Sequence, residues 1–146
     1  SNEHDTSIMV DKSWRQLWSL RLDNPLDDAE TLKLDQVGNI TELGKKPSGY
    51  EDIQGQYTGL IKIKKHKIKE LVKFYQDLDR DVLYEGKSFE NMYMTTFIQL
   101  LIDSGWQINA SNVNNGWLEV DTVSDLNLYE DLMRKGRITS KYLINY

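Results

Sequence analysis

Apolar side chains recur every three or four residues in four stretches of this chain, the spacing that places them on one face of a helix. Two of the predicted helices carry end signals. Gly105 is a left-handed stop after Asp103, and Thr122 with Asp125 has the pattern of a capping box. The stripes are Trp14, Leu17 and Trp18; Ile68, Leu71, Val72, Tyr75 and Leu78; Met94, Phe97, Ile98 and Leu101; and Leu126, Tyr129, Leu132 and Met133.

Shorter apolar or alternating runs predict strands. The turn Val37-Gly38-Asn39 predicts one hairpin, and Asn114-Asn115-Gly116 predicts another. The run from Gln56 to Ile63 is apolar on both faces, which favours a central place in a sheet. We expect strands at 6–11, 31–35, 40–43, 56–63, 106–113 and 117–120.

The order of these elements predicts an α/β sandwich with a mixed sheet, because hairpins make antiparallel pairs and helical crossovers make parallel pairs. The 146 residues show no internal repeat and no linker, so we expect a single domain over 1–146. The tail from Gly136 to Tyr146 fits either a closing strand or an arm on a partner.

Composition narrows the function classes. The net charge of −5 argues against a nucleic-acid partner, which would favour a basic face. Cysteine is absent, so disulfides and thiolate metal sites are excluded and a cytoplasmic location fits. The apolar runs are too short to span a membrane, and no secretory signal is present at the first residues.

The acid with the clearest functional context is Asp121, at the end of the apolar run Trp117-Leu118-Glu119-Val120. An acid on a rigid strand end can hold Mg²⁺, which takes one or two carboxylates together with phosphate oxygens and water. Glu119 lies two residues earlier and shares the face of Asp121. The alternative is structural: a strand-ending acid, or a charge placed favourably at the next helix's N-terminus.

Lys45 and Lys46 lie in a loop bounded by Gly44 and Pro47, where ammonium groups can meet phosphate as point charges. A solvated turn is the alternative. The segment 24–30 carries Asp27, Asp28 and Glu30; it is either a cation site or an acidic turn, without the ligand spacing of a calcium loop.

Taken in order, five segments resemble the C-terminal half of bacterial nucleotidylyltransferases, in the branch similar to choline-phosphate cytidylyltransferases and sugar-phosphate nucleotidylyltransferases. The resemblance implies a Rossmann-like α/β fold and the joining of a nucleoside triphosphate to a phosphorylated sugar or alcohol, with release of pyrophosphate. It also implies a role in cell-surface polysaccharide biosynthesis. The segments are Val10-Asp11-Lys12 with Trp14, then 24–30, 42–47, 55–60 and 117–121.

The resemblance implies a role for each matching residue. Asp121, assisted by Glu119, would bind Mg²⁺. Lys46, with Lys45 beside it, would approach the acceptor or its phosphate. The remaining substrate-binding positions would be Glu42, Gly55, Tyr57 and Gly59.

The family's glycine-rich nucleotide loop and its first metal-binding acid have no counterpart in this sequence. We therefore expect a partial domain, the acceptor-side half, that has little or no activity alone and binds Mg²⁺ only with the nucleotide-binding half present. Uncovered sheet edges and apolar faces would favour a homodimer. The alternatives are a non-catalytic binding or oligomerisation module derived from that fold, and a metal-dependent glycosyltransferase using Glu119 and Asp121.

Overall fold

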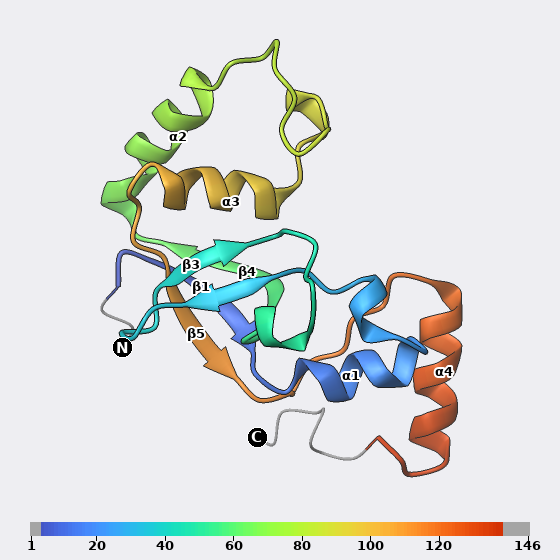
Figure 1. Cartoon of the computed structure of the whole chain (residues 1–146). Coiled ribbons are helices and arrows are strands. Elements are labelled where there is room, and N and C mark those ends of the chain that lie inside the picture. Colours follow the sequence, from blue (N-terminus) through green and yellow to red (C-terminus); the bar gives the residue numbers. More distant parts are fainter. Residues whose placement is uncertain (1–3, 139–146) are drawn as a thin grey trace.

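The computed structural model describes residues 4–138. A small mixed sheet and a two-stranded hairpin form its middle, as Figure 1 shows. Helices α2 (Ile68–Asp77) and α3 (Met94–Asp103) lie on one side, and α1 (Trp14–Arg21) and α4 (Val123–Arg134) lie on the other. The four predicted helices and the α/β class with a mixed sheet are confirmed. The tail beyond residue 138, predicted to be a strand or an arm, lies outside the described residues.

The central strand of the three-stranded sheet is β1 (Thr6–Asp11). It pairs antiparallel with β4 (Gln56–Ile63) and parallel with β5 (Asn109–Val113). Apart from Met9, every residue of β1 is buried, which fits a strand with neighbours on both edges. The mixed pairing follows from the connections, since long helical excursions separate β1 from β5.

The predicted hairpin is confirmed in β2 (Leu32–Leu34) and β3 (Ile40–Leu43). Gly38 in its turn has a φ of +87°, a conformation that glycine adopts without strain. The hairpin packs on the sheet through Ile40, whose N–H donates to the carbonyl of Ile108. The first core lies between hairpin, sheet and α3, and consists of Ile8, Val10, Leu32, Ile40, Leu43, Ile98, Leu101, Ile108 and Ala110.

A second core joins α1 to α4, the pair shown together in Figure 1. The Trp14 and Trp18 rings meet edge to face, with centroids 5.9 Å apart. Thr122 caps α4 in the predicted capping box with Asp125, since each side chain accepts the other residue's backbone N–H. The core residues are Trp14, Leu17, Trp18, Ala29, Ile53, Tyr129, Leu132 and Ile138.

The predicted strand at 117–120 and its hairpin with β5 are wrong. Asn115 and Gly116 do have positive φ angles of 58° and 90°, but the turn leads the chain away from β5. The Trp117 indole N–H donates to Asp11, and its ring packs beside Trp18. Side-chain burial against α1 thus replaces backbone pairing, and Asp121 follows an irregular segment.

Two strand predictions need correction. The run at 56–63 forms β4, but this strand lies at the edge of the described sheet, and Leu60 is 62% exposed. Its apolar outer face therefore did not indicate a central position. The strand predicted from Trp106 begins at Asn109, because the N–H of Trp106 donates to Leu101 in the turn that ends α3.

Candidate functional site

Arg21, at the end of α1, holds three carboxylates. Its side chain is 4% exposed and pairs with Glu119 at 2.5 Å, Asp121 at 2.5 Å and Asp125 at 3.1 Å. Burial alone would lower the pKa of Arg21, but its hydrogen bonds with Asp125, Asp121 and Glu119 raise it instead. The guanidinium therefore stays charged and ties α1 to the segment leading into α4. We call Arg21, Glu119, Asp121 and Asp125 the Arg21 cluster.

The acids of the Arg21 cluster differ in environment. Burial raises the pKa of Glu119; the hydrogen bond and charge of Arg21 act in the opposite direction, and the charges of Asp121 and Asp28 add to the rise. The hydrogen bond from Arg21, followed by those from Thr122, lowers the pKa of Asp125 to about 2. Asp121 is the accessible member, with 58% of its side chain exposed.

We expect Asp125→Asn to flatten the acid dependence of stability. The pKa of Asp125 falls from its ordinary 3.8 to about 2 on folding, so ionised Asp125 favours the folded state. This contribution is complete above about pH 4 and is lost as pH falls through about 2. Urea unfolding at several pH values between about 2 and 4 should show that the free energy of unfolding changes less steeply with pH in the variant than in wild type. Asp23→Asn, which changes an exposed acid, is the control; equal slopes for Asp125→Asn and wild type would contradict the assignment.

The loop from Gly44 to Pro47, which carries Lys45 and Lys46 and which we call the lysine loop, is fixed to the start of the hairpin. The N–H of Thr31 donates to the Lys45 carbonyl at 2.8 Å, and the N–H of Gly44 donates to the Thr31 carbonyl at 3.1 Å. Lys45 pairs with Glu42 at 3.3 Å. Lys46 Nζ donates to the Leu26 and Asp27 carbonyls, both at 2.9 Å. Because neutral carbonyls are its partners, the Lys46 charge is not neutralised by an acid within residues 4–138.

Glu42 lies between two lysines, since it also pairs with Lys33 at 3.1 Å. Burial would raise the pKa of Glu42, but Lys33 and Lys45 lower it. Glu42 is therefore an ionised anchor for the lysine loop. Its predicted contact with substrate stays a prediction.

The predicted positions on β4 also have structural explanations. A Cβ at Gly55 would lie 2.4 Å from Cγ1 of Val10, so only glycine fits there. Gly59 has a φ of +85° where the register with β1 shifts, as expected in a bulge. Burial and the charge of Glu30 raise the pKa of Tyr57. A substrate role for Gly55, Tyr57 and Gly59 stays a prediction.

The turn at 24–31 connects these groups. Its carbonyls at Leu26 and Asp27 hold Lys46, and the charge of Asp28 acts on Glu119. The carbonyl of Glu30 accepts from Gln56 on β4 at 2.7 Å. The loop of Lys45 and Lys46 and strand β4 therefore both contact this turn, whereas the Arg21 cluster interacts with it only through the charge of Asp28. No ion pair within residues 4–138 joins Lys45 or Lys46 to Asp121.

Glu30 differs from the exposed acids of that turn. Burial raises its pKa, while a hydrogen bond from Thr95 on α3, at 3.2 Å, acts in the opposite direction. Asp27 instead accepts from Asn24 at 2.8 Å. The acidic segment therefore divides into separate environments and does not converge on one cation.

Two charged residues received no role of their own in the sequence analysis. Asp11 is the acid that does end a buried strand: it is 0% exposed and accepts from Ser13, Asn115 and Trp117 at 2.8, 3.0 and 2.9 Å. Those bonds connect β1 to the turn after β5. Arg21 follows the predicted stripe of Trp14, Leu17 and Trp18 and was assigned no role from the sequence. Its position three residues after Trp18, at the end of an apolar stripe, was the available signal.

The described chain alone does not build a complete metal site. No group of three or more His, Cys, Asp or Glu side chains suited to a metal occurs among residues 4–138. Asp121 nevertheless fits a site shared with phosphate: Arg21 binds Oδ2, and Oδ1 has no hydrogen bond within the described part. Mg²⁺ accepts such a single carboxylate when phosphates and water complete its shell.

One comparison with known proteins gives a strong match. The chain is 49% identical over 124 residues to the CTP:phosphoglutamine cytidylyltransferase of Campylobacter jejuni subsp. jejuni. The match covers 85% of this chain and 49% of the relative, so the chain spans about half the relative's length. The resemblance to cytidylyltransferase-like nucleotidyltransferases is thereby confirmed.

The other comparisons found no match. No protein-family model and no solved structure matches the chain. Within residues 4–138, every helix is too short or too polar to cross a membrane.

Proposed function

We propose that this chain, which is related to the cytidylyltransferases, is the acceptor-side part of a Mg²⁺-dependent enzyme that joins CTP to a phosphorylated acceptor. The observation that supports the proposal most strongly is the 49% identity over 124 residues. The proposal includes two expectations: the chain forms part of a Rossmann-like nucleotidyltransferase domain, and it corresponds to the C-terminal half of that domain. Cytoplasm is the compartment we expect.

In the proposed reaction, an oxygen of the acceptor phosphate attacks the α-phosphorus of CTP. The bond between that phosphorus and the oxygen bridging to the β-phosphate breaks, and pyrophosphate leaves with the electron pair. Such chemistry depends mainly on positioning and charge stabilisation. The residues of this chain would supply the acceptor's side of that arrangement.

Lys46 is the residue we assign to the acceptor phosphate. Its ammonium donates to two backbone carbonyls and to no acid within residues 4–138, and the turn at 24–31 orients it. Lys45 is neutralised by Glu42 and would assist by holding the loop. Tyr57, Gly55 and Gly59 would let β4 approach the acceptor closely.

Asp121 is the residue we assign to Mg²⁺, with Glu119 beside it. When bound, Mg²⁺ would neutralise charge on the reacting phosphates. Arg21 fixes Asp121 from one side and leaves the second carboxylate oxygen accessible. The same positive charge disfavours a cation at Asp121 until phosphate arrives, so we expect the chain alone to bind Mg²⁺ weakly.

The acceptor class follows from the relative. Its name specifies phosphoglutamine, so we propose a phosphorylated amide as the first candidate. Sugar phosphates and choline phosphate are the alternatives indicated by the sequence motifs. The CTP-binding residues would come from a part of the enzyme that corresponds to the unmatched region of the Campylobacter relative.

Titration of the ¹⁵N-labelled chain tests the acceptor assignment. We expect phosphoglutamine to shift the amide resonances of residues 42–47, whereas CTP alone should leave the spectrum unchanged. Lys46→Ala should weaken acceptor binding by about tenfold, since it removes a charge-assisted contact. Lys73→Ala, which changes an exposed lysine of α2, is the matched control.

Two results of this titration would overturn the proposal. One is binding of CTP without binding of any of the three phosphorylated acceptors. The other is acceptor binding that Lys46→Ala and Lys73→Ala leave equally strong. Each result would place the recognition of phosphate elsewhere.

The second candidate is a non-catalytic binding or oligomerisation module derived from the same fold. The observation that favours it is the apolar surface of α2, where Val72 is 47% and Tyr75 43% exposed. A chain that associates but never binds a phosphorylated acceptor would support this alternative.

A further inference from the structure

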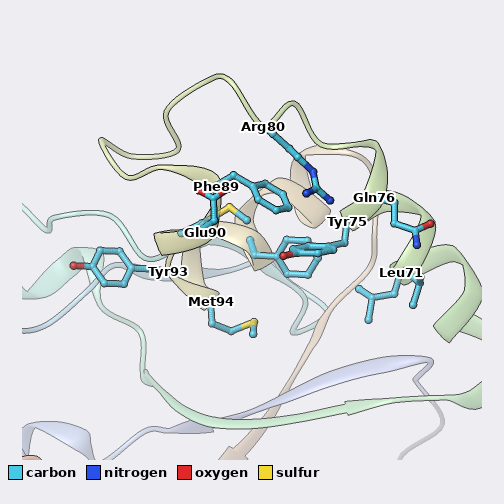
Figure 2. Close-up of a pocket in the computed structure, with 11 residues that line it drawn as sticks. Leu71, Tyr75, Gln76, Arg80, Phe89, Glu90, Tyr93 and Met94 are labelled. Carbon is cyan, nitrogen blue, oxygen red and sulfur yellow. The ribbon is translucent and has the colours of Figure 1, made fainter.

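An apolar groove lies between α2 and the segment that leads into α3. It encloses about 540 Å³, and Figure 2 shows Tyr75, Phe89 and Met94 around it. A second apolar hollow of about 380 Å³ continues between the helices and the sheet. The two share Leu71, Met94 and Phe97, so they form one continuous surface, which we call the α2–α3 groove.

Several of the residues that line the α2–α3 groove are exposed to solvent. No residue of α2 is buried, although Ile68, Leu71, Val72 and Tyr75 form an apolar stripe along it. Val72, Tyr75, Tyr93 and Met94 line the groove and are 47%, 43%, 55% and 52% exposed. Exposed apolar residues gathered in this way mark an interaction surface more often than a solvated face.

Two charges at the groove indicate what covers it. Arg80 and Glu90 both line it, on opposite sides of Phe89 in sequence. The Arg80 guanidinium lies 4.8 Å from the Phe89 ring centroid, and Figure 2 shows it directed toward the groove. Within residues 4–138, neither Arg80 nor Glu90 forms an ion pair.

One unneutralised cation and one unneutralised anion on the same apolar groove are self-complementary. In a two-fold interface each contact occurs twice, so residue i of one copy meets residue j of the other and the reverse. A two-fold axis that passes midway between Arg80 and Glu90 would pair these two residues of different copies twice, with the apolar lining of the groove between the pairs. A partner that carries charges of a single sign would pair with either Arg80 or Glu90, but not with both.

We propose that the α2–α3 groove is the contact surface of a symmetric dimer of this chain, in which Arg80 of each copy pairs with Glu90 of the other. The dimer covers the exposed face of α2 and closes both hollows. It uses helices, and so differs from pairing through the free edge of β4. It does not depend on the cytidylyltransferase assignment.

Sedimentation velocity of the full chain over a concentration series tests the proposal. Wild type should reach twice the monomer mass. Arg80→Glu places two acids opposite each other at both contacts. Glu90→Arg places two cations opposite each other there. Each variant alone should raise the dissociation constant at least about a hundredfold, because like charges meet at an interface. Lys69→Glu makes the same charge change on α2 outside the groove and should dimerise normally.

Mixing the two variants tests the pairing of Arg80 with Glu90 directly. An Arg80→Glu chain and a Glu90→Arg chain together restore opposite charges at both contacts, so the mixture should form heterodimers while each component alone stays monomeric. This arm also shows that both variants fold. A monomeric wild type at about 100 μM would overturn the proposal. So would a dimer that survives both single variants, or a mixture that stays monomeric.

Discussion

Arg21→Ala should destabilise the chain by about 3 kcal/mol, the largest loss we expect from a single charged residue. The substitution leaves Glu119, Asp121 and Asp125 adjacent without their cation. Removing one member of a buried ion network costs about 3–5 kcal/mol, because the remaining charges stay desolvated. We take the lower end because Asp121 is 58% exposed and is screened by water.

Urea unfolding at neutral pH measures this loss. Arg134→Ala is the matched control, since Arg134 lies at the end of α4 and, among the described residues, donates a hydrogen bond only to the Glu130 carbonyl. Arg21→Lys should give an intermediate loss, because one ammonium cannot reach three carboxylates as a planar guanidinium does. If Arg21→Ala lies within about 1 kcal/mol of wild type, the cluster is a surface network with little effect on stability.

Asp121→Asn should reduce the rate of cytidylyl transfer at least about a hundredfold in a reconstituted enzyme, because the metal loses a ligand charge at the reacting phosphates. Reconstitution combines this chain with the part of the Campylobacter relative outside the matched region. The concentration of Mg²⁺ needed for half the maximal rate should rise as well. Stability should change little, since the side chain is largely exposed.

Two comparisons separate a metal ligand from a structural acid. Asp23→Asn removes an exposed acid outside the Arg21 cluster and should keep the full rate. Glu119→Gln should have a smaller effect than Asp121→Asn, since Glu119 is only 30% exposed and is held by Arg21. An active Asp121→Ala enzyme with an unchanged Mg²⁺ requirement would show that the metal assignment is wrong.

Local sequence patterns predicted the local structure well. The α3 stripe, the Gly105 stop and the Thr122 cap act within a few residues, so their physics is visible in the sequence. The hairpin around Gly38 is likewise local. Each of these predictions is confirmed.

The errors at 117–120 and at Arg21 concern partners that are distant in sequence. The run at 117–120 looks like a strand, but Trp117 binds Asp11 across 106 residues instead of pairing in a sheet. The bonds of Arg21 to Glu119 and Asp121 span 98 and 100 residues. Periodicity describes which face of an element is apolar and contains no information about such partners. Asp121 therefore follows an irregular segment instead of the predicted strand end, and its metal role stays a prediction.

The most direct test of the central claim is product formation in the reconstituted enzyme with CTP, Mg²⁺ and phosphoglutamine. We expect a cytidylylated acceptor and one pyrophosphate per product when both parts are present, with neither product from this chain alone. A chain that adds nothing to the complementary part, or that turns over CTP without it, would contradict the acceptor-side assignment.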